Sequence, residues 1–549
     1  MSHRGSGSTD VIIAGGGHNG LVAACYLARA GLKVQVLEAS PVIGGMTATN
    51  EMLPEAPGHM INEASIHASL FRNTAIDAEL ELTSKYGLRM RRVDPAHVHL
   101  GFEGESIAMW QDANRTAAEI AHFSKKDARA WLDFVESVTA GVEIGLPLML
   151  TSAVKPEPKQ LAKALAKMGK HRKELLPLAR WIMQGHAEAI EERFEHPLVR
   201  GPLTINLPFM PFDSDASAYA LIYLGVYHRT GVAMFEGGTG AFPKALIACL
   251  QDAGGSVRAN ARVEQILVDG GRAVGVRLEG GEEIRANTAV MTSFSPKRVL
   301  GELLPEGALS HVDEVKVRHI PTNETGARDY KLNIALKGKL QMPRHQEWRA
   351  KTFPGDNVDL KLPCLTWHTH DQALEAFRAC VRGEVPEHVP GLSQITTAFD
   401  PGMAPEGHDT FWFWTGLTPG NPNEGWDVAR EKITNRVIEE SSYFYEGLEE
   451  LEIGRRPLAK PDIAERFNAI DGNVYHVDPI ITRLGPMRPA LGLGNFQAPI
   501  DGLWMTGSGT HSIPGISGMP GHNASKTLLR ELRSEKRRRV VRRLTGRAA

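Results

Sequence analysis

The first forty residues constrain the fold of this chain more than any other part of it. Residues 10–14 (DVIIA) are apolar enough for a short buried strand, and the glycine-rich turn GGGHNG at 15–20 follows at once. Residues 21–30 then carry apolar side chains at helical spacing, and residues 33–38 (KVQVLE) resemble a second strand that ends in an acid. This order of strand, glycine turn, helix and strand predicts a dinucleotide-binding βαβ unit.

Each glycine of the turn has a physical role in such a unit. Gly15 permits the tight turn, Gly17 lets the backbone approach a pyrophosphate, and Gly20 lets the helix pack close to the strand. The N-terminus of the helix then faces the phosphates. Glu38 lies about twenty residues further on, where a carboxylate can accept hydrogen bonds from ribose hydroxyls.

A second glycine pair indicates which nucleotide is bound. Gly44 and Gly45 lie just after the strand that ends in an acid, within PVIGGMT at 41–47. This pattern resembles the second glycine motif of flavoproteins that bind FAD in an extended form, so the sequence favours FAD over NAD. We identify no attachment motif and expect the FAD to be bound non-covalently. Besides the glycines and Glu38, the residues of this region expected to contact FAD are His18, Asn19, Ala39, Met46 and Thr47.

A third glycine-rich segment lies near the C-terminus. Residues 502–511 (GLWMTGSGTH) are typical of a strand that runs into a glycine turn, and a helix is predicted from Pro520 to about Leu532. The free N–H groups and partial positive charge of such a helix start favour an anion. Further back, alternating apolar residues over 256–278 predict a β-meander. The residues expected to contact FAD from these segments are Val263, Gly507, Ser508, Gly518, Met519, Pro520 and Gly521.

Composition limits the remaining possibilities. The 549 residues are 42% hydrophobic and 23% charged, which allows roughly two to four domains or one large discontinuous fold. The formal net charge of -2 gives no reason to expect a nucleic-acid partner. The four cysteines form no CxxC pair, so we expect neither a disulfide framework nor a metal site. The sequence shows no apolar leader and no run of about eighteen apolar residues, so we expect a cytoplasmic protein without a spanning helix.

The middle of the chain has a different character. Residues 106–233 carry helical spacing with few glycines, and we interpret them as a helical insertion that caps a substrate site. Helices are predicted at 116–142 and 158–194, joined by the apolar connection 146–150 (LPLML). The glycine turn at 237–240 enters a further helix but has no clear buried strand before it.

We therefore predict an α/β fold in which a discontinuous, Rossmann-like FAD-binding domain of the glutathione-reductase type accompanies a mixed-sheet substrate domain. The FAD-binding domain comprises residues 9–105, 234–305 and 462–532. The substrate domain with its helical cap comprises residues 106–233 and 306–461, and residues 533–549 form a basic C-terminal tail. Strands at 331–336 and 410–415 and a helix at 426–444 are predicted within the substrate domain.

Three separated segments, 15–45, 237–276 and 502–524, together resemble the phytoene desaturase-like flavoproteins. That family includes bacterial carotenoid desaturases, desaturase-type carotene ketolases, retinol saturase and the pyridine-nucleotide-disulfide oxidoreductase domain-containing proteins. GGGHNGLV at 15–22, GSGTH at 507–511, GNVYH at 472–476 and Arg488-Pro489 are most similar to the last group. In many relatives Pro-Gly follows the position of His511, whereas Ser512 and Ile513 follow it here, which changes the wall beside the flavin.

The resemblance implies an FAD-dependent dehydrogenase or desaturase that moves hydride from a C–H bond of a hydrophobic, isoprenoid-like substrate to flavin N5. The helix start at 519–522 would stabilise negative charge on the flavin pyrimidine. A proton must also leave the substrate, and His67, His228 and His511 are the candidate bases because histidine titrates near neutrality. Three alternatives stay open: a flavin-dependent saturase or isomerase, an amine oxidase, and a flavin-binding partner protein without turnover.

The expected partners follow from this chemistry. The chain carries one dinucleotide fingerprint, so we expect its electrons to pass to oxygen or a quinone. A hydrophobic substrate suggests peripheral contact with the inner face of a membrane. The basic amphipathic helix at 159–173, the apolar residues 146–150 and the basic run at 536–543 are the predicted means of contact.

Overall fold

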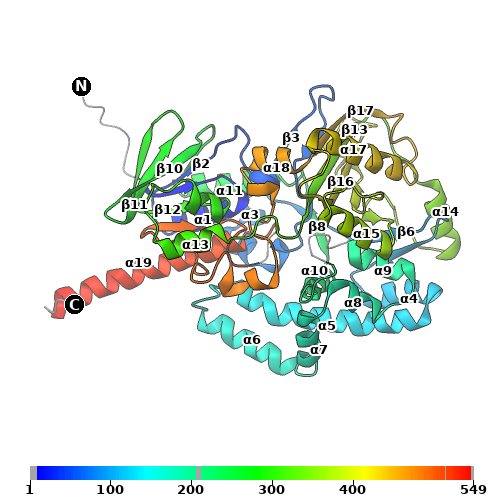
Figure 1. Cartoon of the computed structure of the whole chain (residues 1–549), viewed down its shortest axis with the longest axis horizontal. Coiled ribbons are helices and arrows are strands. Elements are labelled where there is room, and N and C mark those ends of the chain that lie inside the picture. Colours follow the sequence, from blue (N-terminus) through cyan, green and yellow to red (C-terminus); the bar gives the residue numbers. More distant parts are fainter. Residues whose placement is uncertain (1–8, 206–211, 513–514, 546–549) are drawn as a thin grey trace.

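Figure 1 shows the computed structural model of the chain, which describes residues 9–205, 212–512 and 515–545. Two β-sheets lie side by side, and a group of helices, α4 to α10, covers them on one side. The long C-terminal helix α19 (Met519–Thr545) projects away from the first sheet.

The first sheet has the strand order β10-β11-β12-β1-β2-β9, with β18 paired to the far end of β12. Its parallel strands are β1 (Thr9–Ala14), β2 (Val34–Leu37), β9 (Ser256–Arg258), β12 (Glu283–Thr292) and β18 (Leu503–Met505). The antiparallel meander consists of β10 (Val263–Asp269), β11 (Arg272–Leu278) and the start of β12. Helix α1 (His18–Arg29) packs against α11 (Ala241–Asp252) and α19 on one face of the central strand β1, and residues of the meander cover its other face, so β1 is buried on both faces.

The second sheet has the order β17-β13-β16-β15-β14-β6-β7. Its strands are β6 (His97–Leu100), β7 (Ser106–Met109), β13 (Ala327–Leu336), β14 (Cys364–Thr366), β15 (Leu392–Ile395), β16 (Asp409–Pro419) and β17 (Glu452–Leu458). Only β14 and β6 pair in parallel. Side chains alternate along β13, so Tyr330, Leu332 and Ile334 enter one hydrophobic core, while Asp329 and Lys331 point to the opposite face.

The helical insertion, which we call the cap, comprises α4 (Ala113–Phe123), α5 (Lys125–Met149), α6 (Pro158–Lys170), α7 (Leu175–Met183), α8 (His186–Glu191), α9 (Pro197–Ile205), the 3-10 helix η3 (Ala218–Tyr223) and α10 (Leu224–Thr230). The prediction of a connection at 146–150 was wrong, because α5 continues through Pro147 and ends at Met149. Burial of Leu146 and the bond from the Leu150 N–H to the Leu146 carbonyl hold this last turn. The predicted helix 116–142 is divided at Ser124, whose hydroxyl caps α5 by accepting from the Asp127 N–H.

Other elements differ from the prediction in extent. The buried strand β8 (Val232–Phe235) does precede the glycine turn at 237–240, and it pairs with β5 (Met90–Val93). Helix α19 continues to Thr545, and residues 97–100 belong to the second sheet. Among the described residues, no helix has both the length and the apolar character needed to cross a bilayer. The remaining elements are β3 (Thr49–Glu51), β4 (Met60–Asn62), α2 (Ile76–Leu80), α3 (Leu82–Tyr86), α12 (Pro296–Gly301), α13 (His311–Arg318), α14 (Pro343–Thr352), α15 (His370–Val381), α16 (Thr396–Phe399), α17 (Trp426–Ser442), α18 (Lys460–Phe467) and short 3-10 turns.

Candidate functional site

The first glycine turn connects β1 to α1 at one end of a large cavity. Gly15 has a φ of +99°, a conformation that favours glycine. A Cβ added at Gly20 would lie 2.4 Å from the Gly15 carbonyl oxygen, so glycine is required there for α1 to pack close to the turn. A Cβ at Gly17 would meet nothing nearer than the Ser293 Oγ at 3.9 Å. Gly17 therefore borders open space, as a residue beside a pyrophosphate must.

Glu38 follows β2 and lies in the wall of the same cavity. The Gly16 N–H donates to one carboxylate oxygen at 2.7 Å, and the Ser40 N–H donates to the other at 2.8 Å. These bonds fix the carboxylate beside the glycine turn. Ala39 and Val263 also line the cavity here, so the residues predicted at the ribose end are brought together.

The second glycine pair packs on the first turn. Gly44 and Gly45 have φ angles of +131° and +56°, and the Gly44 N–H donates to the Gly16 carbonyl at 3.0 Å. A Cβ at Gly45 would lie 3.2 Å from the Gly17 Cα. Met46 lines the cavity, whereas Thr47 is buried behind the turn and its hydroxyl donates to the Gly44 carbonyl.

The third glycine segment follows β18 and leads to α19. Ser508, Gly515 and Ile516 line the cavity; Ile513 and Pro514 lie outside the described residues. A Cβ at Gly521 would lie 2.0 Å from the Asn19 carbonyl oxygen, so this glycine lets α19 pack directly on α1. Of the remaining residues predicted to contact FAD, the cavity lining does not include Gly507, Gly518, Met519, Pro520 or Gly521. Their contact with the flavin stays a prediction.

Arg488 holds this segment from behind. Its fully buried guanidinium donates to the carbonyl oxygens of Ser508 and Tyr475 at 2.9 Å and of Val477 at 3.1 Å. Burial lowers the pKa of Arg488 to about 10, so it remains charged at neutral pH. The side chain thus ties the segment at 475–477 to the third glycine segment.

These segments enclose one cavity of about 1130 Å³, which we call the central cavity. On the second sheet, Leu392, Trp414, Lys331 and Leu458 are paired across adjacent strands and form one row of its wall. The cap contributes apolar side chains, namely Val142, Ile144, Leu146, Met149, Leu175, Leu178, Ile182, Ile222 and Val226. Tyr219, Tyr223 and Tyr227 line the same side. The cavity therefore runs from the glycine turns to an apolar and aromatic compartment.

The glycine-rich end of the cavity fits FAD. Five buried polar atoms there have no hydrogen-bond partner among the described residues: His18 Nε2, Asn19 Oδ1, His476 Nδ1, His511 Nδ1 and Ser512 Oγ. Leaving such groups unpaired costs about 1–3 kcal/mol each, so this end is suited to a polar ligand. The open space at Gly17 suits the pyrophosphate, and the fixed Glu38 carboxylate suits the ribose.

The three predicted bases differ in position. His67 lines the cavity, with its Nε2 3.5 Å from the Cys364 Sγ, and burial lowers its pKa to about 4. His511 also lines the cavity, and its Nε2 lies 3.1 Å from the Leu148 carbonyl oxygen at the end of α5. His228 lies outside the cavity lining, with its Nδ1 3.1 Å from the Gln111 carbonyl oxygen. The structure thus brings His67 and His511 to the cavity, but not His228.

Sequence reasoning missed two charged residues that β13 places in the cavity. Lys331 is only 3% exposed; its ammonium group contacts the Asn62 carbonyl, and burial lowers its pKa well below the usual range. Asp329 accepts a hydrogen bond from the Trp414 indole N–H at 2.9 Å, and burial raises its pKa to about 7. The charged residues within the mainly apolar stretch 327–336 were the signal available in the sequence.

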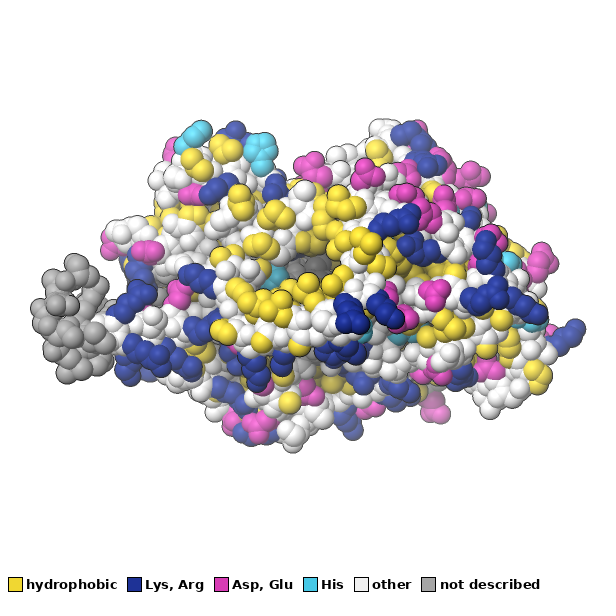
Figure 2. Space-filling view, turned by 90° about the horizontal axis from the view of Figure 1, so that it is seen from below, with side chains coloured by type: hydrophobic (Ala, Val, Ile, Leu, Met, Phe, Trp, Pro, Cys, Tyr) yellow, Lys and Arg dark blue, Asp and Glu magenta, His cyan; other side chains and the backbone are white. Residues whose placement is uncertain are grey.

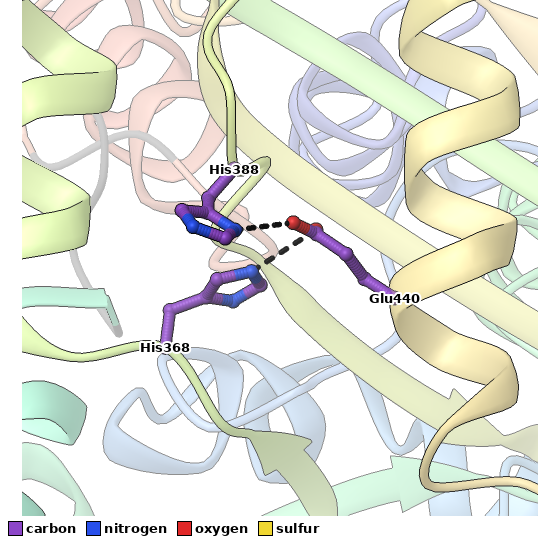
Figure 3. A group of neighbouring side chains, drawn as sticks. All are labelled: His368, His388 and Glu440. Atoms are coloured by element: carbon purple, nitrogen blue, oxygen red, sulfur yellow. Dashed lines mark hydrogen bonds and ion pairs between the residues drawn. The ribbon is translucent and has the colours of Figure 1, made fainter.

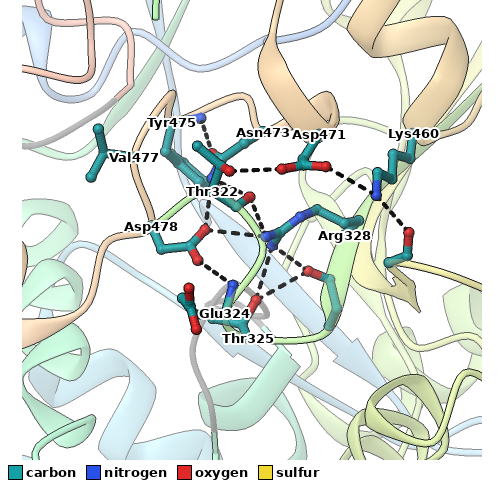
Figure 4. Close-up of polar contacts among 12 residues, drawn as sticks. Thr322, Glu324, Thr325, Arg328, Lys460, Asp471, Asn473, Tyr475, Val477 and Asp478 are labelled. Atoms are coloured by element: carbon teal, nitrogen blue, oxygen red, sulfur yellow. Dashed lines mark hydrogen bonds and ion pairs between the residues drawn. The ribbon is translucent and has the colours of Figure 1, made fainter. Parts of the chain in front are cut away.

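Networks of ion pairs and hydrogen bonds hold the walls of the central cavity in place. The buried Arg328–Asp478 ion pair, 3.3 Å long, joins β13 to the segment that carries Tyr475 and His476 (Figure 4). Asn473 Nδ2 donates to the Asp478 Oδ1 at 2.7 Å, and the Glu324 N–H donates to the Asp478 Oδ2 at 2.7 Å. Elsewhere in the lining, Arg466 donates two bonds of 2.7 Å to the buried Glu63 carboxylate.

Comparisons with known proteins agree with this geometry. The profile of the family described as flavin containing amine oxidoreductase matches residues 20–326, more than half of the chain. The chain is 28% identical over 560 residues to pyridine nucleotide-disulfide oxidoreductase domain-containing protein 2 of Mus musculus, covering 96% of this chain and 94% of that protein. It is 24% identical over 523 residues to phytoene desaturase (lycopene-forming) of Pantoea ananas, covering 93% and 96%. The solved structure of an oxidoreductase from Methanosarcina mazei has a similar fold, with a TM-score of 0.59 at 13% identity over 95% of this chain and 100% of that one. The predicted fold class is thereby confirmed.

Proposed function

We propose that this chain, which belongs to the flavin-containing amine oxidoreductase family and is an FAD-dependent oxidoreductase, oxidises a C–H bond of a hydrophobic, isoprenoid-like substrate. The resemblance to phytoene desaturase-like flavoproteins is confirmed by the family match and by the desaturases among its relatives. The substrate class and the hydride step are our proposal.

The observation that carries the proposal is the character of the central cavity beyond its glycine-rich end. The cap lines it with aliphatic side chains, and the second sheet adds the rings of Trp412 and Trp414. Such a wall offers a long apolar substrate many contacts and few hydrogen bonds, which favours a hydrocarbon over a polar metabolite.

Bound FAD supplies the acceptor for the hydride that leaves the substrate C–H bond. The chain holds the substrate between the cap and the second sheet, excludes water, and receives the proton that leaves the neighbouring carbon. His67 is the proposed proton acceptor, because its ring lines the cavity and an uncharged imidazole carries a nitrogen lone pair that can take up a proton. We assign oxygen or a quinone as the final electron acceptor, because the chain carries a single dinucleotide fingerprint.

The test is product analysis with FAD-loaded protein, linear isoprenoid polyenes and air. We expect a product that lacks two hydrogen atoms, detected by mass spectrometry. His67→Asn should slow its formation by about 10²–10⁴-fold, whereas His228→Asn, whose ring lies outside the cavity, should not. Unchanged polyenes after incubation with FAD-loaded protein would contradict the proposed substrate class.

A second candidate activity is amine oxidation. Asp329 lies beside the rings of Trp414 and Tyr475 in the cavity lining. The ammonium group of an amine could form an ion pair with the Asp329 carboxylate and a cation–π contact with these rings. Release of hydrogen peroxide with a lipophilic primary amine, but not with polyenes, would favour this activity.

The proposal includes peripheral contact between the cap and a membrane. The predicted amphipathic helix forms α6, and its apolar side chains Leu161, Leu165 and Met168 are exposed rather than packed on the protein. Lys167 and Lys170 are bound to Glu143 of α5, at 2.6 and 3.1 Å. The charges of α6 left for anionic headgroups are therefore those of Lys159 and Lys163, both exposed.

Helix α7 connects this surface to the central cavity. Leu175, Ala179 and Ile182 line the cavity, while Leu176 and Met183 on the same helix are 80% and 69% exposed. Figure 2 shows hydrophobic side chains gathered around a hollow on the side of the cap, with lysine and arginine side chains further out. A substrate dissolved in lipid would thus meet an apolar path into the cavity. The basic run on α19 begins with three exposed side chains, Lys536, Arg537 and Arg538. The structure describes no side chains of this run after residue 538.

Flotation with anionic liposomes tests this contact. Burying Leu176 and Met183 in lipid contributes about 1.5–3 kcal/mol each, so Leu176→Asp with Met183→Asp should weaken binding by more than about tenfold. The control is Val312→Asp on α13, which removes an apolar side chain that is 62% exposed from another helix. Wild-type protein that stays at the bottom of the gradient at low salt would contradict the contact.

A further inference from the structure

Three side chains with metal-binding atoms meet in the second sheet's domain. His368 follows β14, His388 lies between α15 and β15, and Glu440 lies near the end of α17. Figure 3 shows both imidazole rings directed at the Glu440 carboxylate. His368 Nε2 lies 3.0 Å from Oε2, and His388 Nδ1 lies 2.8 Å from Oε1. None of the three lines the central cavity, so the cluster is separate from the flavin site.

We propose that His368, His388 and Glu440 bind one divalent transition-metal ion, for which Zn²⁺ is the probe. Imidazole nitrogen and carboxylate oxygen are ligands of Zn²⁺, and two histidines with one glutamate form a three-ligand set that leaves one coordination position open. All three ligand atoms lie within 4.8 Å of one another. Two ligand atoms at about 2.0–2.1 Å from a tetrahedral Zn²⁺ lie roughly 3.3 Å apart. The observed imidazole–carboxylate distances of 3.0 and 2.8 Å would therefore have to increase only slightly for Zn²⁺ to bind.

The second sheet's domain holds this arrangement before any metal binds. Arg436, one turn before Glu440 on α17, donates to the carbonyl oxygens of Val385 and Pro386. The Val389 N–H donates to the Glu440 Oε2 at 3.2 Å. The segment that carries His388 is therefore fastened to α17 on both sides of that histidine. This reduces the ordering that metal binding would otherwise require.

Exposure gives the site one closed and one open side. The side chain of His368 is 1% exposed and that of Glu440 17%, whereas that of His388 is 41% exposed. A metal ion can therefore enter past His388, and a water molecule can occupy the open position. Bound metal would join the start of α15, the segment before β15 and α17, and so stabilise the substrate domain. The ligands lie too far apart in the sequence to form a spacing motif, which is why the sequence predicted no metal site.

Equilibrium dialysis of the FAD-loaded full chain against Zn²⁺, after treatment with a chelator, tests the proposal. We expect one Zn²⁺ per chain at a site whose affinity falls at least about tenfold in both Glu440→Gln and His388→Asn. His388→Asn changes a partly exposed side chain and should leave folding intact. Co²⁺ should give visible absorption bands in the wild type that Glu440→Gln lacks.

The matched control is His408→Asn, which disrupts the His59–His408 pair, 3.3 Å apart, and should leave Zn²⁺ binding unchanged. Failure to bind Zn²⁺ would overturn the proposal, as would equal binding by the wild type and both ligand variants. The cluster would then be only a hydrogen-bonded clamp. FAD content should stay constant throughout, so neither outcome bears on the proposed oxidation.

Discussion

Gly17→Ala tests where the pyrophosphate lies, because the structure separates its effect on folding from its effect on the ligand. Gly17 has φ −67° and ψ 161°, which alanine adopts without strain. The added Cβ would lie 3.9 Å from the Ser293 Oγ, an ordinary contact. The variant without FAD should therefore unfold with a free energy within about 0.5 kcal/mol of the wild type.

The same methyl group would occupy the space of the bound pyrophosphate. Overpacking of this kind costs about 1–3 kcal/mol, which corresponds to a rise in the Kd for FAD of roughly 5–150-fold. Gly20→Ala is the matched comparison, because its Cβ would lie 2.4 Å from the Gly15 carbonyl oxygen. That substitution should lower the stability of the protein without FAD by about 1–3 kcal/mol.

Two measurements on the protein from which FAD has been removed separate the two effects: titration with FAD, followed by flavin fluorescence, gives the affinity, and thermal unfolding gives the stability. We expect Gly17→Ala to lose FAD affinity at an unchanged Tm, and Gly20→Ala to lose Tm. Wild-type FAD affinity in Gly17→Ala would refute the placement of the pyrophosphate. A Tm of Gly17→Ala as low as that of Gly20→Ala would show that Gly17 does not border open space.

Three further predictions concern β13. Arg328→Met would leave the buried Asp478 carboxylate without its ion-pair partner and should lower the free energy of unfolding by about 3–5 kcal/mol; a loss below about 1 kcal/mol in denaturant titration would contradict this. Burial raises the pKa of Asp329 to about 7, so between about pH 4 and 7 the folded protein keeps a proton that the unfolded chain releases. The free energy of unfolding therefore falls by at most about 4 kcal/mol as the pH rises across this range. Asp329→Asn should flatten this fall in Tm, and an equally steep fall in the variant would exclude Asp329 as its source. Lys331 carries a buried amine on the cavity wall whose pKa burial lowers, so we assign it the relay of the proton that leaves the substrate; Lys331→Met should retain FAD yet slow substrate oxidation by about 10²-fold, which steady-state rates would disprove if they matched the wild type.

The backbone arrangement of the glycine turns could be predicted from the sequence because its geometry is local. The roles of Gly15 and Gly20 depend on backbone spacing within one turn, and the structure shows the positive φ and the close approach that these roles require. The acid at the end of the second strand reaches the first turn for the same reason, since neighbouring parallel strands end at one edge of the sheet.

The substrate end could not be predicted, because it depends on contacts between distant segments. Local propensity ends a helix before Pro147, yet burial of Leu146 against the cavity carries α5 to Met149. His67 and His228 cannot be told apart from the sequence, because only the packing of the second sheet and the cap decides which ring lines the cavity. Lys331 was overlooked for the same reason, since its burial follows from the pairing of β13 with two neighbouring strands.

The most direct test of the proposed oxidation is to mix the FAD-loaded protein anaerobically with a linear isoprenoid polyene and to record the absorbance of the bound flavin. We expect the oxidised flavin spectrum to bleach and admitted oxygen to restore it, whereas an equal amount of a saturated hydrocarbon of the same length should leave the spectrum unchanged. A flavin that stays oxidised with every polyene, yet bleaches with a lipophilic amine, would contradict the proposed substrate class.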